Sequence, residues 1–191
     1  MEECRLTAKD LACRRGDRLL FARLSLDLAA GQALQVAGAN GLGKSSLIRL
    51  LAGLMRPFSG SVERVGTTAL VDEKPALDEH QPLGAALGFW AALDHGNAPL
   101  DRLGIAGLMD VPVRYLSTGQ RKRAALVRLI GQQASVWLLD EPLNGLDTHG
   151  VTLVETLVAE HCAAGGIAVV ASHQPFTLPG LLRLDLAEFA A

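Results

Sequence analysis

The stretch GANGLGKSS at residues 38–46 constrains the fold more than any other feature of the sequence. It fits the phosphate-loop pattern G-x-x-x-x-G-K-[ST] in full, between an apolar run at 32–38 and a helical segment at 44–53. In that setting backbone amides converge on phosphate oxygens, and the helix N-terminus adds a favourable dipole. A glycine-rich turn followed by a surface lysine is the competing interpretation, and the full match in this context disfavours it. The sequence therefore predicts a phosphate-loop NTPase core.

The loop residues are the first candidate contacts to a nucleotide. Lys44 is expected to reach the β- and γ-phosphates, and the Ser45 hydroxyl is expected to hold Mg²⁺. The expected nucleotide-binding residues of the loop are Gly38, Ala39, Asn40, Gly41, Leu42, Gly43, Lys44, Ser45 and Ser46.

Short apolar runs alternate with helical stretches along the chain. Runs at 68–71, 135–140 and 166–172 favour strands, and a helical segment precedes each of the last two. Alternation of this kind indicates an α/β fold with a mainly parallel sheet and crossover helices.

Between about residues 76 and 134 the strand pattern disappears and the sequence becomes helical, which predicts an inserted helical subdomain. We expect a single domain over 1–191, with an α/β core formed by 1–75 and 135–191. Phe89 and Trp90 in the insert leave two interpretations open. They contact a partner, or they pack inside the subdomain.

The motif VWLLDEP at residues 136–142 is a run of four apolar residues that ends in two carboxylates. A buried strand of this kind places Asp140 at its C-terminal edge, where open α/β sheets bind ligands. Asp140 suits a contact to Mg²⁺, and Glu141 is suited to orient and deprotonate an attacking water. The alternative is an acidic turn ended by Pro142, which the phosphate loop disfavours.

His173 follows another apolar run, VVASH at residues 169–173. An isolated histidine after a strand is usually structural or solvated. Here Gly38, Asp140 and His173 each lie at or just after the C-terminal end of an expected strand. The phosphate loop that begins at Gly38 and the side chains of Asp140 and His173 can therefore meet at one edge of the sheet. This convergence favours a hydrogen bond from His173 to the γ-phosphate.

Charge and composition bear on the partners. The net charge is −2, with 18 basic and 20 acidic residues well mixed, whereas nucleic-acid binders more often show a basic face. No apolar run approaches the roughly 18 residues that span a bilayer, and the N-terminus lacks the apolar core of a signal peptide. We therefore expect a soluble cytoplasmic chain with no nucleic-acid partner, and another polypeptide must supply any membrane part.

Taken together with the phosphate loop, the stretches LSTGQ (116–120), LLDEP, NGLD (144–147) and SHQ resemble the nucleotide-binding subunits of ABC transporters. The order and spacing agree over nearly the whole chain, and a pentapeptide LSGGQ marks that family. The resemblance implies an ATPase that uses ATP and Mg²⁺, with an N-terminal antiparallel β portion beside the parallel sheet.

The resemblance also implies roles for particular residues. Two subunits would dimerise head to tail when they bind ATP, and each LSTGQ segment would close over the partner's nucleotide. Glu141 and His173 match the catalytic glutamate and the switch histidine, and Asp147 matches a loop that crosses the dimer interface. The signature residues that would act in trans are Ser117, Thr118, Gly119 and Gln120, of which Thr118 departs from the usual glycine.

Two further positions depart from the family pattern. Family members carry a glutamine after the strand at 68–71, and an ungapped alignment places Lys74 there. An ammonium group repels Mg²⁺ and cannot coordinate it, so Gln81 is the alternative if the loop is rearranged. Many members also stack an aromatic residue on adenine where this chain has Arg15. A guanidinium plane can stack on a flat ring, and a solvated arginine is the other interpretation.

A narrower resemblance, carried by residues 11–31, 111–129 and 172–175, is to the haem-exporter ATPases of cytochrome c biogenesis. It implies integral membrane partners of the cytochrome c maturation system and a peripheral place on the cytoplasmic face of the bacterial inner membrane. The alternatives are the ATPase of another small-substrate exporter, a soluble ABC ATPase outside transport, and a nucleotide-binding module without turnover. Soluble ABC ATPases usually have long coiled-coil insertions or paired domains, which this chain lacks.

Overall fold

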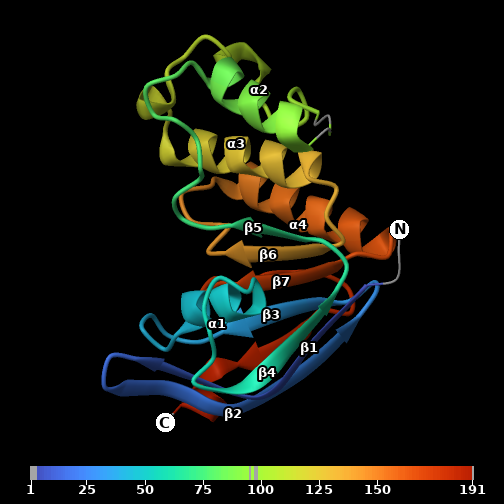
Figure 1. The fold of residues 1–191 in the computed structure, drawn as a ribbon. Coiled ribbons are helices and arrows are strands. Elements are labelled where there is room, and N and C mark those ends of the chain that lie inside the picture. Colours follow the sequence, from blue (N-terminus) through green and yellow to red (C-terminus); the bar gives the residue numbers. More distant parts are fainter. Residues whose placement is uncertain (1–3, 95, 97–98, 191) are drawn as a thin grey trace.

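The computed structural model describes residues 4–94, 96 and 99–190. Figure 1 shows two sheets and a group of helices arranged in layers. The antiparallel sheet lies at one end of the molecule, the parallel sheet is in the middle, and the long helices gather at the other end.

The parallel sheet is the framework on which the site is built. Its five strands pair in the order β5-β6-β7-β3-β8, and every pair is parallel. The strands are β3 (Ala33–Ala37), β5 (Thr68–Val71), β6 (Val136–Asp140), β7 (Ile167–Ala171) and β8 (Leu182–Asp185). The predicted parallel sheet is confirmed, and β8 is an edge strand that the apolar pattern did not predict.

A second sheet forms the expected N-terminal antiparallel portion. Its three strands pair in the order β2-β1-β4, and both pairs are antiparallel. They are β1 (Arg5–Arg15), β2 (Arg18–Ala29) and β4 (Ser59–Val65). Arg15 and Arg18 face each other at the hairpin end, where Gly16 takes the left-handed φ of 58° that a tight turn favours.

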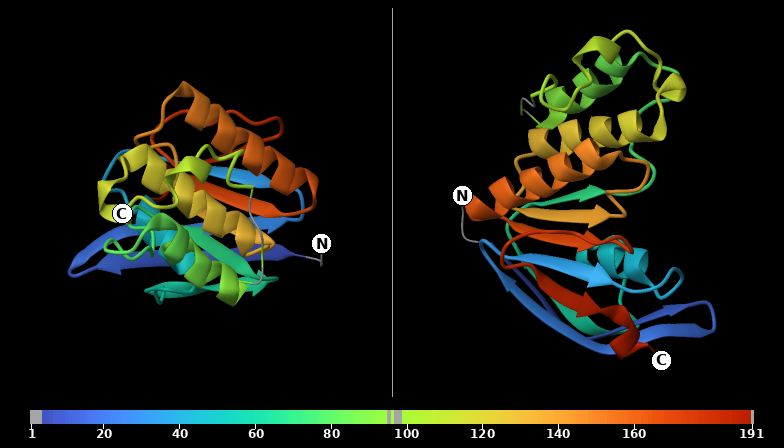
Figure 2. Two further views of the ribbon diagram at one scale, coloured as in Figure 1. Left: turned by 90° about the horizontal axis from the view of Figure 1, so that it is seen from above. Right: turned by 180° about the vertical axis from the view of Figure 1, so that it is seen from behind.

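The helices divide between the two sides of the parallel sheet. Helix α1 (Lys44–Leu51) follows the phosphate loop and packs on the side of the antiparallel sheet, whereas α4 (Thr148–Ala163) packs on the opposite side. The insert contributes α2 (Leu83–Asp94) and α3 (Thr118–Gly131); α3 packs against the edge strand β5, and α2 packs against α3 (Figure 2). Short 3₁₀ turns complete the chain at Ala106–Leu108, Val113–Tyr115 and Leu186–Phe189.

Strand β6 shows how one apolar run builds two cores. All five of its residues are buried, because the sheet is covered on both faces. Val136 and Leu138 join the core shared with α1 and the antiparallel sheet, whereas Trp137 and Leu139 join the core shared with α3 and α4. None of the helices in the described part of the chain combines the length and apolar character that crossing a bilayer requires.

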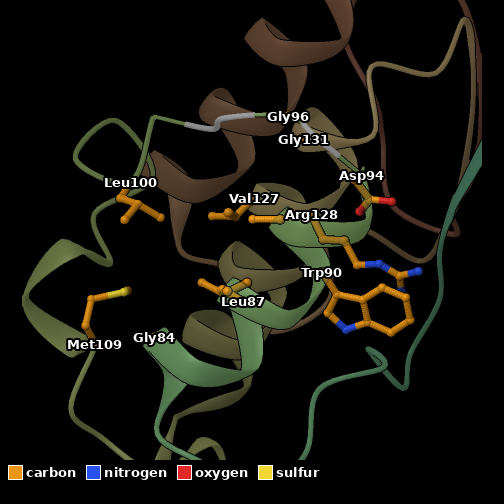
Figure 3. Close-up of a pocket in the computed structure, with 12 residues that line it drawn as sticks. Gly84, Leu87, Trp90, Asp94, Gly96, Leu100, Met109, Val127, Arg128 and Gly131 are labelled. Atoms are coloured by element: carbon orange, nitrogen blue, oxygen red, sulfur yellow. The ribbon is translucent and has the colours of Figure 1, made fainter.

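The helical insert contains an apolar pocket of about 210 Å³ between α2 and α3 (Figure 3). Leu87 and Val127 line it, and the Arg128 guanidinium lies 3.4 Å from the centroid of the Trp90 ring. Trp90 also donates its indole N–H to the carbonyl of Ala76, so this aromatic residue packs within the insert. Phe89 is 61% exposed. Packing inside the subdomain therefore holds for Trp90, whereas a partner contact of the exposed Phe89 stays a prediction.

Candidate active site

The phosphate loop connects the C-terminal end of β3 to the first turn of α1. Gly38, Gly41 and Gly43 have φ values of 139°, 84° and 108°, which only glycine adopts without strain. Lys44 is 6% exposed, and its Nζ donates to the carbonyl oxygen of Gly38 at 2.8 Å. The loop backbone therefore surrounds a buried ammonium group. Its conformation requires glycine at these three positions.

Ser45 and Asp140 meet across the sheet. The Ser45 hydroxyl donates to Asp140 Oδ1 at 3.0 Å, and Asp140 is 3% exposed at the end of β6. Burial raises the pKa of Asp140, the hydrogen bond from Ser45 lowers it, and the nearby charges of Glu141 and Glu73 raise it further. A hydroxyl beside a buried carboxylate is an all-oxygen donor set, which fits a hard cation such as Mg²⁺.

Glu141 is held on several sides. Its backbone N–H donates to the Ala171 carbonyl at 2.8 Å, and its Oε1 lies 3.4 Å from Lys44 Nζ. The Nδ1–H of His173 donates to its Oε2, with 2.9 Å between the two atoms. The φ of Glu141 is 46°, a left-handed conformation that costs a non-glycine residue about 1–3 kcal/mol and is found mostly at functional sites.

These groups surround one open cleft at the C-terminal ends of β3, β6 and β7. The sequence-predicted residues that line it are Arg15, Asn40, Gly41, Gly43, Lys44, Ser45, Ser46, Glu141 and His173. Asp140 is buried behind this lining and reaches it through Ser45. The remaining residues of the phosphate loop do not line the cleft but stabilise the loop. Gly38 and Ala39 offer carbonyl oxygens to Lys44, and Leu42 packs against the core.

Leu20, Glu73 and Asn144 line the same cleft and were missed by the sequence reasoning. Leu20 lies close to Gly43 of the phosphate loop, where a Cβ on that glycine would come within 3.2 Å of the leucine side chain. Asn144 belongs to the NGLD stretch, and its side-chain oxygen accepts from Gln174 Nε2 at 3.2 Å. A motif match gave no signal for Leu20 or Glu73, because only the folded chain brings them to the cleft.

The loop after β5 carries Lys74, the position that the ungapped alignment gives for the family's glutamine. Glu73, and not Lys74, lines the cleft, while Lys74 lines two hollows beside α3. Directly after β5, the Lys74 N–H donates to Asp72 Oδ1 at 3.0 Å, which forms a local turn that includes Glu73. Gln81 lies beside Ala85 and Phe89 on α2 and is not among the residues that line the cleft.

The signature residues form the start of α3. Ser117 and Gln120 make both hydrogen bonds of a capping box, with Gln120 N to Ser117 Oγ at 3.2 Å and Ser117 N to Gln120 Oε1 at 2.8 Å. A Cβ on Gly119 would lie 2.8 Å from the carbonyl oxygen of Gly145, so contact within the chain already requires glycine here. Thr118 places its methyl group against Gly145, where it fills the space next to this loop.

No residue of the Ser117–Gln120 segment is among the described residues that line the cleft, so the chain does not bring its own signature to its own phosphate loop. Asp147 has a clear role within the chain. It is the N-cap of α4, and its Oδ1 accepts from the Gly150 N–H at 2.8 Å.

A phosphate loop after a central parallel strand, an acidic strand end, a histidine after the next strand and a capped signature helix define the ABC class of ATPases. The family model described as ABC transporter matches residues 21–144. The cytochrome c biogenesis ATP-binding export protein CcmA of Novosphingobium aromaticivorans is 57% identical over 189 residues, covering 99% of each chain. The protein of the same name from Zymomonas mobilis is 49% identical, covering 98% of this chain and 86% of its own.

A solved structure of an ATP-binding subunit of an ABC transporter superimposes with a TM-score of 0.77 at 23% identity, covering 88% of this chain and 79% of its own. At that identity the likeness bears on the fold, which it confirms. The chain belongs to the ABC transporter family and, within it, to the cytochrome c biogenesis ATP-binding export proteins. It is thus an ATP-binding subunit with the ATPase fold of this family.

Proposed function

We propose that this chain hydrolyses ATP as one subunit of a membrane complex that handles or exports haem in cytochrome c biogenesis. The observation that carries the proposal is the Glu141 arrangement, in which the carboxylate lies between Lys44 and His173 on the cleft. Such a group accepts a proton from a water that attacks the γ-phosphate, provided that the phosphate lies on the loop.

Each side chain at the cleft has a separable part in this reaction. Lys44 binds the β- and γ-phosphates once its ammonium leaves the loop carbonyls, and the loop amides donate hydrogen bonds to the remaining phosphate oxygens. Glu141 orients the water and takes its proton, and His173 donates from its ring to the γ-phosphate and to Glu141. Phosphate binding and activation of the attacking water are therefore carried by different residues at the same edge of the parallel sheet.

Ser45 and Asp140 are the residues that would hold Mg²⁺. Their hydroxyl and carboxylate oxygens are already 3.0 Å apart, and the buried Asp140 charge needs a compensating cation. The metal, when bound, supplies positive charge that neutralises the phosphate oxygens during transfer.

The active form is proposed to be an ATP-dependent head-to-tail homodimer. In support, the signature turn lies outside its own cleft, yet its Ser117 hydroxyl and helix N-terminus are suited to a phosphate. A partner subunit would bring these groups to the nucleotide, with Asp147 near the interface. In this arrangement the whole chain acts as one ABC ATPase domain, with 76–134 as its helical subdomain.

Integral membrane subunits of the cytochrome c maturation system are the proposed partners, with the chain bound at the cytoplasmic face of the bacterial inner membrane. The support is the 57% identity to a protein named for cytochrome c biogenesis and export. The other class of partner, nucleic acid, is disfavoured because basic and acidic residues nearly balance.

Complementation of a deletion strain that lacks the native copy of this subunit tests the proposal. We expect the wild-type chain to restore haem attachment to c-type cytochromes and to co-purify with the maturation membrane proteins. The Glu141→Gln variant should co-purify equally but restore no attachment. Co-purification with a different exporter, together with normal cytochromes in the deletion strain, would contradict the cytochrome c assignment and favour another small-substrate exporter.

Arg15 is proposed to stack on the adenine ring, because it lines the same cleft as Leu20 and the phosphate loop. Arg15→Ala is expected to raise the KM for ATP about 2- to 5-fold with little change in kcat, since an exposed cation–π contact contributes about 0.5–1 kcal/mol. Steady-state phosphate release measures both constants. Arg14→Ala is the matched control, because Arg14 lies over the Phe58 ring and not on the cleft. Equal effects of the two variants would show that Arg15 is only a solvated charge.

A further inference from the structure

Lys122 is a buried lysine that the roles described above do not use. It lies in α3, five residues after Ser117, and is 6% exposed. Its Nζ donates to the backbone carbonyl oxygen of Glu141 at 3.1 Å. This bond joins the signature helix to the end of β6, two elements that come from the inserted and the central part of the fold.

The carbonyl that Lys122 contacts belongs to a strained residue. Glu141 has a φ of 46°, and a left-handed non-glycine residue persists only where its surroundings fix it. Its N–H is fixed by the Ala171 carbonyl at 2.8 Å. Its carbonyl oxygen is fixed by Lys122 and, at 3.4 Å, by the N–H of Asn144.

Burial and the surrounding charges act in opposite directions on the Lys122 ammonium group, and burial has the larger effect on its pKa. Burial lowers its pKa, and the carboxylates of Glu73, Asp140, Asp72 and Glu141 raise it. Lys122 thus adds a buried cation near the acidic end of β6 and the loop after β5, in addition to Lys44. Removal of this cation would leave the Glu141 carbonyl with one weaker donor and the carboxylates with less compensation.

We propose that Lys122 is a positioning residue for Glu141. Its hydrogen bond holds the Glu141 backbone in the conformation that directs the carboxylate to Lys44 and His173. Because Lys122 and the signature turn belong to one helix, a shift of α3 moves both, so the position of the signature is transmitted to the group that activates water. The inference rests on the proposed hydrolysis and deepens it.

Steady-state ATP hydrolysis by Lys122→Met, Lys122→Gln and Lys9→Met tests this role. Lys122→Met keeps the volume but removes the donor, and we expect kcat to fall about 10- to 100-fold with KM within about 3-fold, since small misplacements of reacting groups have effects of this size. Lys122→Gln retains an amide donor and should keep kcat within about 5-fold of wild type. Lys9 is an exposed lysine of β1 and serves as the control.

A double-mutant cycle separates positioning from a general loss of structure. If Lys122 acts through Glu141, Lys122→Met should lower the residual rate of Glu141→Gln no further, whereas a separate structural defect would reduce it again. Unchanged kcat in Lys122→Met, or fully additive losses, would overturn the inference.

A crystal structure of nucleotide-free Lys122→Met gives a readout that needs no activity. We expect Glu141 to leave the left-handed region and its contact to His173 to break. An unchanged Glu141 backbone would refute the positioning role even if the variant is slow. An inactive wild-type complex would contradict the proposed function instead, and this structure would still decide the role of Lys122.

Discussion

Replacing Glu141 with glutamine is expected to lower the rate of ATP hydrolysis by about 100-fold or more, because general base catalysis contributes about 10²- to 10⁴-fold. Glutamine has nearly the same shape but accepts no proton from water. ATP binding should persist, since Lys44 and the loop amides remain and one negative charge near the γ-phosphate is gone. Phosphate release at saturating ATP and equilibrium binding of a fluorescent ATP analogue measure the two effects separately.

Glu63→Gln is the matched control for this prediction, because Glu63 is an exposed carboxylate of β4 in the antiparallel sheet. Turnover of Glu141→Gln within about 3-fold of wild type would remove Glu141 from the reaction. Negligible turnover in both proteins, with or without the membrane partners, would favour a nucleotide-binding module that does not hydrolyse ATP.

Replacing Lys44 with alanine is expected to weaken ATP binding about 10- to 100-fold. A hydrogen bond to a charged group contributes about 1.5–3 kcal/mol, and Lys44 is the buried cation of the phosphate loop. The variant also leaves the buried Glu141 carboxylate without its 3.4 Å partner, so a lower melting temperature without nucleotide should accompany the loss of affinity.

Calorimetric titration with ATP and Mg²⁺ measures this affinity directly. Lys74→Ala is the control, because Lys74 lines hollows beside α3 and not the cleft. An affinity of Lys44→Ala equal to that of Lys74→Ala would mean that the ammonium stays on the Gly38 carbonyl and does not bind phosphate.

The parallel sheet and the polar ends of its strands could be predicted from the sequence. The run at 68–71 is β5 itself, and the runs at 135–140 and 166–172 differ from β6 and β7 by a residue at their ends. Asp140 and His173 come together with the loop because β3, β7 and β6 are neighbours with the same direction. Strand β8 was missed because its side chains are mostly exposed and give no apolar run.

Contacts between distant segments could not be predicted in this way. The turn after β5 contains a hydrogen bond from Lys74 N to the Asp72 side chain, and Glu73 within it lines the cleft together with residues of the distant phosphate loop. Gly119 faces Gly145 across two loops, which no local pattern encodes. For Lys122 the sequence held one signal, because it lies four residues before the apolar Leu126 and so shares a helix face with it.

The mass in solution of Glu141→Gln with ATP and Mg²⁺ tests the central claim that two chains share each nucleotide between a phosphate loop and a signature turn. Light scattering during size-exclusion chromatography should give a dimer with ATP and a monomer with ADP. Adding Ser117→Glu, which places a carboxylate against the partner's γ-phosphate, should leave a monomer that still binds ATP. A monomer of Glu141→Gln at saturating ATP, or a dimer that Ser117→Glu does not weaken, would contradict the account.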